Sequence, residues 1–559
     1  MKKIVMRSVR AALKLVPKNV KNKLKQNERL TGFYINSVRK SGLFFDAPTP
    51  KQTHNLYQAW LLENNTAFNE SCDTQGRWQA VVVGHRDGCV KTQDAVLSLG
   101  AKTCIYLDST CDTLELQRTD FDKNLPVLLL NDGDIPRYGA ISHFLEALKN
   151  ADIVYSDTDE LAADGTCFAP RFLPSWNPEL QLSSGYVRTG IMLRGSMLER
   201  LESIDSIASL IVQFELTRQN LKITHIALPL VHATFDDKKN EKDLLLIRQA
   251  IESKTRAKVA FNNANAINRI LWPNTSPLVS LIIPTKNGKK LVQDCIESII
   301  EKTTYSNYEI VLIDNGSDEQ ESLDYFEHLN AIPKVRVVEY PAEFNYSAIN
   351  NFGVKHAKGS VIGLINNDIE VITPEWLTYM VGHVERETVG CVGAKLLYSD
   401  TRIQHAGVVL GYGGGAGHAH KNFPRHHGGY LNRITATNNF SAVTAACLLV
   451  KRSHFEKVGG LNEEKLSVAF NDVDFCLKVK ALGVNNVYCA EAELFHHESV
   501  SRGLDISPEK AARFNRELAF LQTTWSHIID NDPCYSPNLT LKRENFSVKS
   551  KEEFSDNMK

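Results

Sequence analysis

The feature that most constrains the fold is a series of short apolar runs in the second half of this 559-residue chain, each followed by polar residues. The runs cover residues 279–283, 310–313 and 361–365. Apart from Ser280 they carry no polar side chain, which is typical of strands buried on both faces of a parallel sheet. Segments with helical spacing separate them, as at 291–300. This alternation predicts an α/β fold with a mostly parallel sheet flanked by helices.

Polar side chains stand where each of these strands ends. In open parallel sheets the ligand lies outside the carboxyl ends of the strands, so we expect these side chains to meet at one edge. Their hydroxyl, amide and carboxylate groups suit a ribose, a diphosphate and a divalent cation. They are Thr285, Lys286, Asn287, Asp314, Asn315, Ser317, Asn366 and Asp368.

Charge is distributed unevenly along the chain. Residues 1–30 carry ten Lys or Arg against the single acid Glu28, although the net charge of the whole chain is -1. Apolar residues among these charges predict a short amphipathic helix. Such a helix can lie on anionic lipid or pack on the acidic remainder, and the sequence leaves both readings open.

Cysteine usage and hydropathy predict the compartment. The eleven cysteines include no CxxC pair, which favours free thiols in a reducing compartment. Charged residues interrupt the N-terminal apolar stretch, so no signal peptide is predicted, and no run approaches the roughly 18 apolar residues of a spanning helix. We expect a cytoplasmic protein, attached at most to the inner membrane surface through residues 1–30.

The chain divides into five expected segments. They are a basic arm and helical entry segment (1–77), a first α/β domain (78–235), a linker helix (236–276), a second α/β domain (277–505), and a C-terminal helix with a loose tail (506–559).

The two α/β domains share internal sequence similarity. VLLLNDGDI in the first resembles VIGLINNDI in the second, and LTRQNLKITHIALPLVH resembles CLKVKALGVNNVYCAEAELFH. The equivalent motifs are closer together in the first domain, which predicts the loss of about a strand and a helix. We therefore expect a degenerate tandem copy.

The second domain resembles the inverting glycosyltransferases of family 2, which have the A-type glycosyltransferase fold. The resemblance rests on ordered motifs, namely PLVSLIIPTKN, VLIDNGSD, FNYSAINNFGVKHAKG, LINNDIEV, IQHAGVVLG, NDVDFCLKVKALG and LFHHESVSRG. Within that family it is most similar to bacterial enzymes of O-antigen and other surface polysaccharide synthesis, often described as rhamnosyltransferases. Residues 78–235 resemble the first of two tandem domains in such proteins more faintly, through YSDTDE and PRFLPSWNPELQLSSGYV.

The resemblance implies a metal-dependent enzyme that uses a nucleotide-sugar donor and a glycan or lipid-linked acceptor, with no nucleic-acid partner. LINNDIEV stands in the place of the family's DxD motif, so Asp368 is the implied ligand of Mg or Mn, with Asn366 replacing the first acid. His496 is implied as a further metal ligand or a diphosphate donor.

The resemblance also assigns the base and the donor contacts. Asp472 in NDVDF is the implied general base, whereas Asp474 is better explained as an acid at a helix start. For Asn345, helix capping competes with ligand contact. For Arg502, a solvated surface position competes with a phosphate contact. The implied nucleotide-sugar contacts are Pro284, Thr285, Asn287, Asp314, Asn345, Asn351, Asn366 and Arg502.

The glycine-rich stretch at 411–417 imitates a dinucleotide fingerprint, but His and Pro residues follow it instead of the required helix. We interpret residues 411–433 as a mobile flap over the acceptor site, with Gln404 and His405 close to a bound sugar.

The first domain lacks the implied chemistry. GHRD stands where PTKN stands in the second, and Gln213 falls where Asp472 falls, although Asp132 and Asp134 could still bind a metal. We expect a silent scaffold or acceptor-docking domain. Two rival functions remain for the whole chain: a non-catalytic carbohydrate-binding scaffold, and another nucleotide-dependent enzyme such as a nucleotidyltransferase or dehydrogenase.

Overall fold

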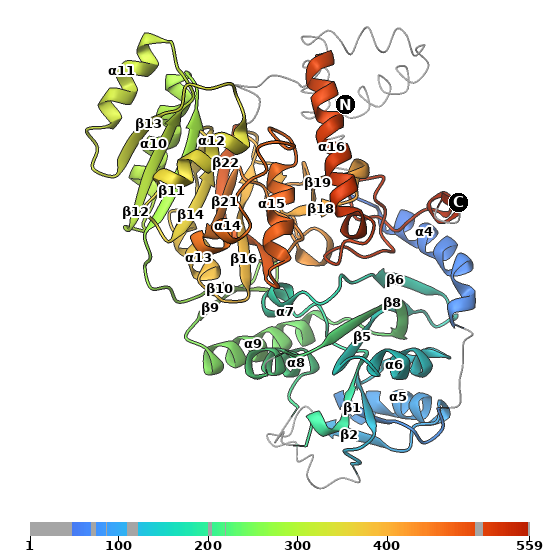
Figure 1. The fold of residues 1–559 in the computed structure, drawn as a ribbon. Coiled ribbons are helices and arrows are strands. Elements are labelled where there is room, and N and C mark those ends of the chain that lie inside the picture. The colour runs from blue at the N-terminus through green and yellow to red at the C-terminus, as the bar shows by residue number, and fades with distance from the viewer. Residues whose placement is uncertain are drawn as a thin grey trace. The chain divides into compact units, whose positions relative to one another are not determined.

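The computed structural model describes residues 47–68, 74–84, 86–108, 121–199, 204–218, 220–497 and 507–556. The chain forms two compact units, drawn in Figure 1. We call Trp272–Asn531 the C-terminal unit, and Pro48–Leu271 with Asp532–Lys559 the N-terminal unit. The predicted basic arm at 1–30 and Arg502 lie outside the described residues.

A ten-stranded sheet forms the centre of the C-terminal unit. Its strands are β11 (Val279–Thr285), β12 (Tyr308–Asp314), β13 (Val335–Glu339), β14 (Val361–Ile365), β15 (Ile369–Val371), β16 (Val389–Leu397), β17 (Ile403–His405), β20 (Asn438–Asn439), β21 (Cys447–Lys451) and β22 (Asn485–His496). Their order is β13-β12-β11-β14-β21-β16-β22-β15, with β17 on β16 and β20 on β22. The three predicted apolar runs are β11, β12 and β14, and they pair in parallel. Antiparallel pairing of β21 with both β14 and β16 makes the complete sheet mixed.

Helices cover both faces of this sheet. They are α10 (Lys289–Lys302), α11 (Gln320–Leu329), α12 (Tyr346–His356), α13 (Trp376–Val384), α14 (Arg452–Lys457) and α15 (Asn471–Lys480). A further helix, α16 (Pro508–Ile529), contacts the 467–469 loop through Glu517. Alternate β11 side chains point to opposite faces: Leu281 and Ile283 join the core under α10, α11 and α13, whereas Ile282 faces α12. A separate hairpin pairs β18 (Val408–Leu410) with β19 (Ala416–His418).

The N-terminal unit has its own eight-stranded sheet. Its strands are β1 (Gln79–Gly84), β2 (Cys104–Asp108), β3 (Pro126–Asn131), β4 (Ile135–Pro136), β5 (Ile153–Leu161), β6 (Cys167–Arg171), β7 (Ile191–Arg194) and β8 (Ile223–His232). The order is β2-β1-β3-β7-β5-β8-β4, with β6 on β5.

The two sheets have the same strand order and the same pairing directions once β13 and β20 are set aside. Thus β1-β3 and β11-β14 are parallel, β3-β7 and β14-β21 antiparallel, β5-β8 and β16-β22 parallel. The edge pairs β4-β8 and β15-β22 also share a register, with Ile135 opposite His232 and Ile369 opposite His496. This order supports the predicted tandem copy, which stays a prediction.

The structure differs from the expected linker helix at 236–276 and from the expected loose tail. The helix in 236–276 is α9 (Asp237–Lys254), which packs on α8 (Ile207–Thr217) and is followed by the hairpin β9 (Lys258–Asn262)–β10 (Ile267–Leu271). The tail packs in the N-terminal unit because it carries apolar residues that become buried, among them Leu539, Phe546 and Val548. The remaining helices of this unit are α4 (Pro50–Glu63), α5 (Arg86–Ser98), α6 (Ala140–Leu148), α7 (Pro178–Ser184) and α17 (Lys551–Asp556).

The expected equivalence of Gln213 and Asp472 is wrong in detail. Asp472 lies in the first turn of α15, whereas Gln213 lies in the middle of α8. The first turn of α8 contains no acid, so the N-terminal unit offers no carboxylate in the position of Asp472. Among the described helices, none is both long enough and apolar enough to cross a bilayer.

Substitution of Gly353 by alanine tests the packing of α12 on the sheet. A Cβ there would lie 2.4 Å from Cγ2 of Ile282. Helix propensity alone favours alanine by about 1 kcal/mol, but overpacking costs about 1–3 kcal/mol, so we expect Gly353→Ala to lower the free energy of unfolding in urea. Lys355→Ala, at an exposed position of α12, is the control. Unchanged or increased stability of Gly353→Ala would contradict this packing.

Candidate functional site

A cavity of about 380 Å³ opens at one edge of the C-terminal sheet. Three of the residues predicted from motifs, Asn366, Asp472 and His496, line it together. Its other walls are Tyr346, Tyr398, Gln404, His418, Lys421, Thr444, Ala445, Ala446, Val468, Ala469, Phe470, Asn471 and Phe514. The structure therefore gathers side chains from LINNDIEV, NDVDF and LFHHESVSRG into one site.

Asp472 stands at the start of α15 with its carboxylate at the cavity wall. The Ala445 N–H donates to its Oδ2 (3.1 Å). Burial raises the pKa of Asp472, and the hydrogen bonds from the backbone oppose that shift. A carboxylate with a raised pKa at a cavity wall has the properties of a proton acceptor.

Asp368 and His496 form a pair beside this carboxylate. Their Oδ1 and Nε2 atoms are 3.0 Å apart, a contact produced by the pairing of β15 with β22. On the other side of the ring, His496 Nδ1 lies 2.6 Å from Gln404 Oε1. A proton on Nδ1 satisfies this acceptor, and in that tautomer Nε2 keeps its lone pair. Asn366 Nδ2 donates to that lone pair (3.1 Å), and Tyr346 donates to Asn366 Oδ1 (3.1 Å).

Helix α16 builds one wall of the cavity, which sequence reasoning missed. Glu517 is only 2% exposed, and its carboxylate accepts hydrogen bonds from the Val468 and Ala469 N–H groups (3.0 and 2.9 Å). Phe470, in a left-handed conformation with φ 58°, and Phe514 complete this wall. A glutamate inside a helix gives no sequence signal that distinguishes it from a surface acid.

The residues at the ends of β11 and β12 form a connected strand-end network. Asn287 Nδ2 donates to Asp318 Oδ1 (2.7 Å), and its Oδ1 accepts from the Asp318 N–H (2.9 Å). Asp314 Oδ1 accepts from the Ser317 hydroxyl (2.6 Å). Thr285 Oγ1 accepts from Asn367 Nδ2 (3.0 Å), which ties β11 to the LINNDIEV turn. Pro284 is half-buried within β11.

Asn345 and Asn351 lie away from the cavity lining. Asn345 caps α12, with Oδ1 accepting from the Ala348 N–H (3.0 Å), so the capping alternative describes its contacts. Asn351 Nδ2 donates to Leu461 O (2.9 Å) and to Glu463 Oε1 (2.7 Å). Asn345 Nδ2 also donates to Glu463 O (2.9 Å), so both amides join α12 to the 461–463 segment.

Two neighbours of the motif residues have other partners. Asp474 Oδ1 accepts from Trp525 Nε1 (2.9 Å), which agrees with a structural role at the start of α15. His497 lies 3.1 Å from Glu370 Oε2 and 2.8 Å from Ser399 Oγ.

Residues 411–433, the expected flap, form part of the cavity wall, and their mobility stays a prediction. Ala419, His420 and Phe423 are buried, and the segment supplies His418 and Lys421 to the cavity. The antiparallel β18–β19 hairpin, whose first strand is buried, joins the start of this segment to the unit. Of the two residues predicted to lie near a sugar, Gln404 lines the cavity, whereas His405 is buried behind it.

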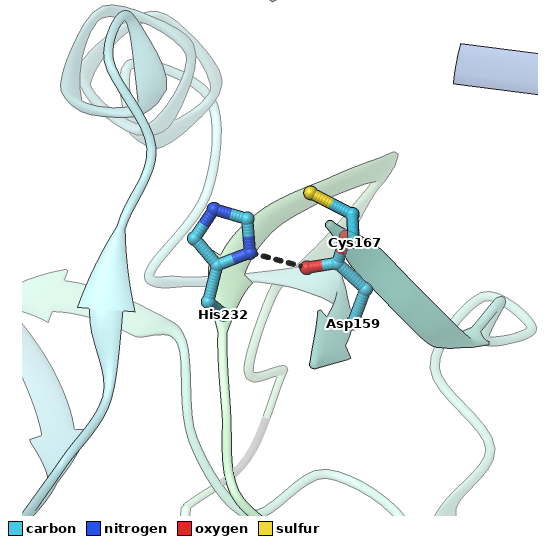
Figure 2. A group of neighbouring side chains, drawn as sticks. All are labelled: Asp159, Cys167 and His232. Atoms are coloured by element: carbon cyan, nitrogen blue, oxygen red, sulfur yellow. Dashed lines mark hydrogen bonds and ion pairs between the residues drawn. The ribbon is translucent and has the colours of Figure 1, made fainter. Parts of the chain in front are cut away.

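A second group of potential metal ligands lies in the N-terminal unit, where Figure 2 shows Asp159, Cys167 and His232 facing one another. His232 Nδ1 is 2.7 Å from Asp159 Oδ1. The Arg137 guanidinium is 2.5 Å from Asp159 Oδ2 and 3.2 Å from Cys167 Sγ, and Tyr57 donates to the same Oδ2 (2.6 Å). Because the guanidinium already supplies the positive charge, we assign no metal to this group.

Residues 280–459 match the model of the family described as glycosyl transferase family 2. The chain carries a glycosyl transferase family 2 domain. The matched segment contains β11 to β21, the strands whose ends carry Thr285, Asp314 and Asp368. The predictions of this family and of its α/β A-type fold are confirmed.

Two curated relatives extend the similarity beyond this domain. The chain is 41% identical over 428 residues to the uncharacterized protein y4gI of Sinorhizobium fredii, covering 73% of this chain and 47% of that protein. It is 32% identical over 409 residues to the O-antigen biosynthesis protein RfbC of Myxococcus xanthus, covering 70% of this chain and 31% of that protein. The chain thus spans half or less of the length of these relatives.

Solved structures show a weaker likeness. A mannosyltransferase from Pyrobaculum calidifontis, in complex with GDP-Man and Mn²⁺, is 15% identical with a TM-score of 0.34, covering 46% of this chain and 70% of that one. GalNAc-T7, with UDP, GalNAc and Mn²⁺, is 16% identical with a TM-score of 0.38, covering 54% of this chain and 60% of that one.

His405 makes the wall of the site sensitive to acid. Its Nδ1 lies 2.8 Å from Ala394 O, and burial lowers its pKa from 6.5 to about 4. On acidification His405 is protonated in the unfolded chain before it is protonated in the folded protein. Its contribution to the free energy of unfolding is therefore fully present well above pH 6.5 and is lost as the pH falls towards 4. From pH 8 to pH 5 we expect this residue to contribute about 2 kcal/mol to the loss of unfolding free energy.

Urea unfolding at both pH values checks this expectation. His405→Gln should lose less stability on acidification than the wild type, whereas His328→Gln, at an exposed position of α11, should behave like the wild type. An equal loss in His405→Gln and the wild type would show that His405 does not carry the effect.

Proposed function

We propose that the C-terminal unit is an inverting glycosyltransferase that transfers a sugar from a nucleotide-diphosphate sugar to a glycan or lipid-linked acceptor. The observation that carries the proposal is the single cavity in which Asp472 meets Asn366 and His496. The family match supports glycosyl transfer, and the name of the Myxococcus relative supports a role in O-antigen-like surface polysaccharide. The proposal includes a cytoplasmic reaction, with residues 1–30 as a contact to the membrane surface.

The Asp368–His496 pair fits a divalent cation, Mg or Mn. Its 3.0 Å separation equals that of two ligands at right angles, each about 2.1 Å from an octahedral ion. With the proton of His496 held on Nδ1 by Gln404, both facing atoms are acceptors, and a positive charge between them removes their repulsion. When bound, the ion would neutralise negative charge on the departing diphosphate. Asn366 orients His496 in this scheme, since its amide nitrogen faces the ring.

Asp472 acts as the base in the transfer step. Its carboxylate takes the proton of the acceptor hydroxyl while the hydroxyl oxygen bonds to the anomeric carbon from the face opposite the diphosphate. The bond between that carbon and the diphosphate oxygen breaks, and its electron pair leaves with the diphosphate. The raised pKa of Asp472 increases its affinity for the proton.

The strand-end network borders the nucleotide in this proposal. Thr285, Pro284 and Asp314 line the donor edge, and Asn287 holds the loop beside it through Asp318. Asn345 and Asn351 act indirectly, by fixing α12. Arg502 remains a proposed phosphate contact.

Replacement of Asp472 by asparagine tests the base. We expect Asp472→Asn to lower kcat about 10²–10⁴-fold because an amide cannot accept the hydroxyl proton. Release of nucleoside diphosphate from uridine, thymidine and guanosine diphosphate sugars with Mn measures turnover, and wild-type turnover should rise with pH through the pKa of Asp472. Asp400→Asn, at an exposed position, is the matched control.

Wild-type turnover in Asp472→Asn would refute this role. A wild-type chain inactive with all three donors would instead favour the scaffold function. Thermal unfolding of both variants establishes that they remain folded.

Replacement of Gln404 by leucine tests the orientation of His496. Loss of the Nδ1 partner allows the proton to move to Nε2, so we expect Mn²⁺ affinity to fall about 10-fold or more, measured by electron paramagnetic resonance without donor. Gln404→Glu, which keeps an acceptor, should retain affinity. His497→Gln is the control for the adjacent ring, and equal affinity in Gln404→Leu and wild type would contradict the assignment.

A further inference from the structure

A second cavity, of about 420 Å³, lies at the carboxyl ends of β1 and β3 in the N-terminal unit. Gly84 ends β1 at the register position that Pro284 has in β11, and Asp132 follows β3 as Asn366 follows β14. The cavity therefore lies at the place in the shared strand order that the proposed donor edge has in the C-terminal unit. Open α/β sheets bind ligands at this edge.

The residues that correspond to Asp368 and His496 bind other side chains in this unit. Asp134, in the position of Asp368, is 1% exposed and accepts from the Thr189 hydroxyl and from the Asn131 N–H (2.7 Å). Burial raises its pKa to about 7. His232, in the position of His496, directs Nδ1 to Asp159 (2.7 Å). Asp134 and His232 therefore do not form a pair like the one proposed to bind a cation through Asp368 and His496.

Lysine side chains bring positive charge to the same cavity. Lys239 Nζ lies 2.8 Å from Asp132 Oδ1, and both side chains are partly accessible, at 33% and 19%. Lys238 and Lys242, from the first two turns of α9, also line the cavity. An ammonium group beside a carboxylate can bridge to a phosphate oxygen, as a divalent ion does.

We propose that this cavity binds a diphosphate group without a metal ion, with the Lys239 ammonium between Asp132 and the phosphate. The four carboxylates of the cavity do not prevent this. Asp132 is paired with Lys239, Asp236 caps α9 through the Lys238 N–H (3.3 Å), and Asp243 is buried with the Ser206 hydroxyl 2.5 Å from its Oδ1. Asp205 is exposed at the rim.

Calorimetry of the full chain in EDTA tests the proposal without any turnover, so its outcome is independent of the proposed transferase activity. The probes are inorganic pyrophosphate, uridine diphosphate and geranyl diphosphate. Pyrophosphate should bind saturably, and more weakly as salt is raised. Tighter binding of uridine diphosphate would identify a nucleotide site, and tighter binding of geranyl diphosphate a lipid-linked one.

Variants separate this cavity from other anion sites. Lys239→Met should weaken pyrophosphate binding about tenfold or more, and Lys239→Arg should restore part of it. Lys258→Met, at an exposed position of β9, is the matched control. No saturable binding in the wild type, or equal binding in Lys239→Met and wild type, would overturn the proposal.

Asp132→Asn distinguishes a diphosphate from an uncharged sugar. Removing this carboxylate releases Lys239 and lowers repulsion, so pyrophosphate should bind as tightly or more tightly. A sugar hydroxyl would instead lose its acceptor. Loss of binding in Asp132→Asn comparable to that in Lys239→Met, with melting temperatures unchanged, would therefore also overturn the proposal.

Discussion

The register of β15 on β22 is the constraint on which the site depends. Ile369 pairs with His496, so the residue before Ile369 and the end of β22 meet at one point of the sheet edge. This pairing puts a carboxylate 3.0 Å from an imidazole nitrogen. A slip by one residue would turn the alternate side chains to the other face and separate the two groups. Backbone pairing, more than any single side chain, therefore places the chemistry.

The same register occurs in the N-terminal unit with a different chemical result. Ile135 pairs with His232, yet Asp134 is buried against Thr189, and His232 turns to Asp159. The local partners decide the outcome: the Arg137 guanidinium draws Asp159 into a charged group in which the histidine is one member. Shared strand order thus fixes where polar residues gather, while their neighbours decide whether an ion can bind.

Local patterns were sufficient to predict the strands and the polar residues at their ends, because each apolar run and the polar residues that follow it are adjacent in the sequence. The strands β11, β12 and β14 followed from such patterns, whereas Asp472 and His496 were predicted from the resemblance to family 2 motifs. The contacts that orient these groups join distant segments and left no such signal. Gln404 reaches His496 across 92 positions, and Glu517 reaches Val468 across 49. The apolar residues of the tail were overlooked for the same reason, since only the folded unit supplies their partners.

Gly84 shows that the strand end in the N-terminal unit is shaped around a carboxylate. A Cβ at this position would lie 2.2 Å from Cγ of Asp132, a distance no side chain tolerates. Pro284, at the equivalent position of the C-terminal unit, has a side chain. Glycine therefore permits Asp132 to lie back over β1, towards Lys239. The charge at this edge is then balanced within the protein by an ammonium group, whereas the Asp368–His496 pair has two acceptors facing each other. That difference gives a physical reason for expecting ion-dependent binding in one unit and ion-independent binding in the other.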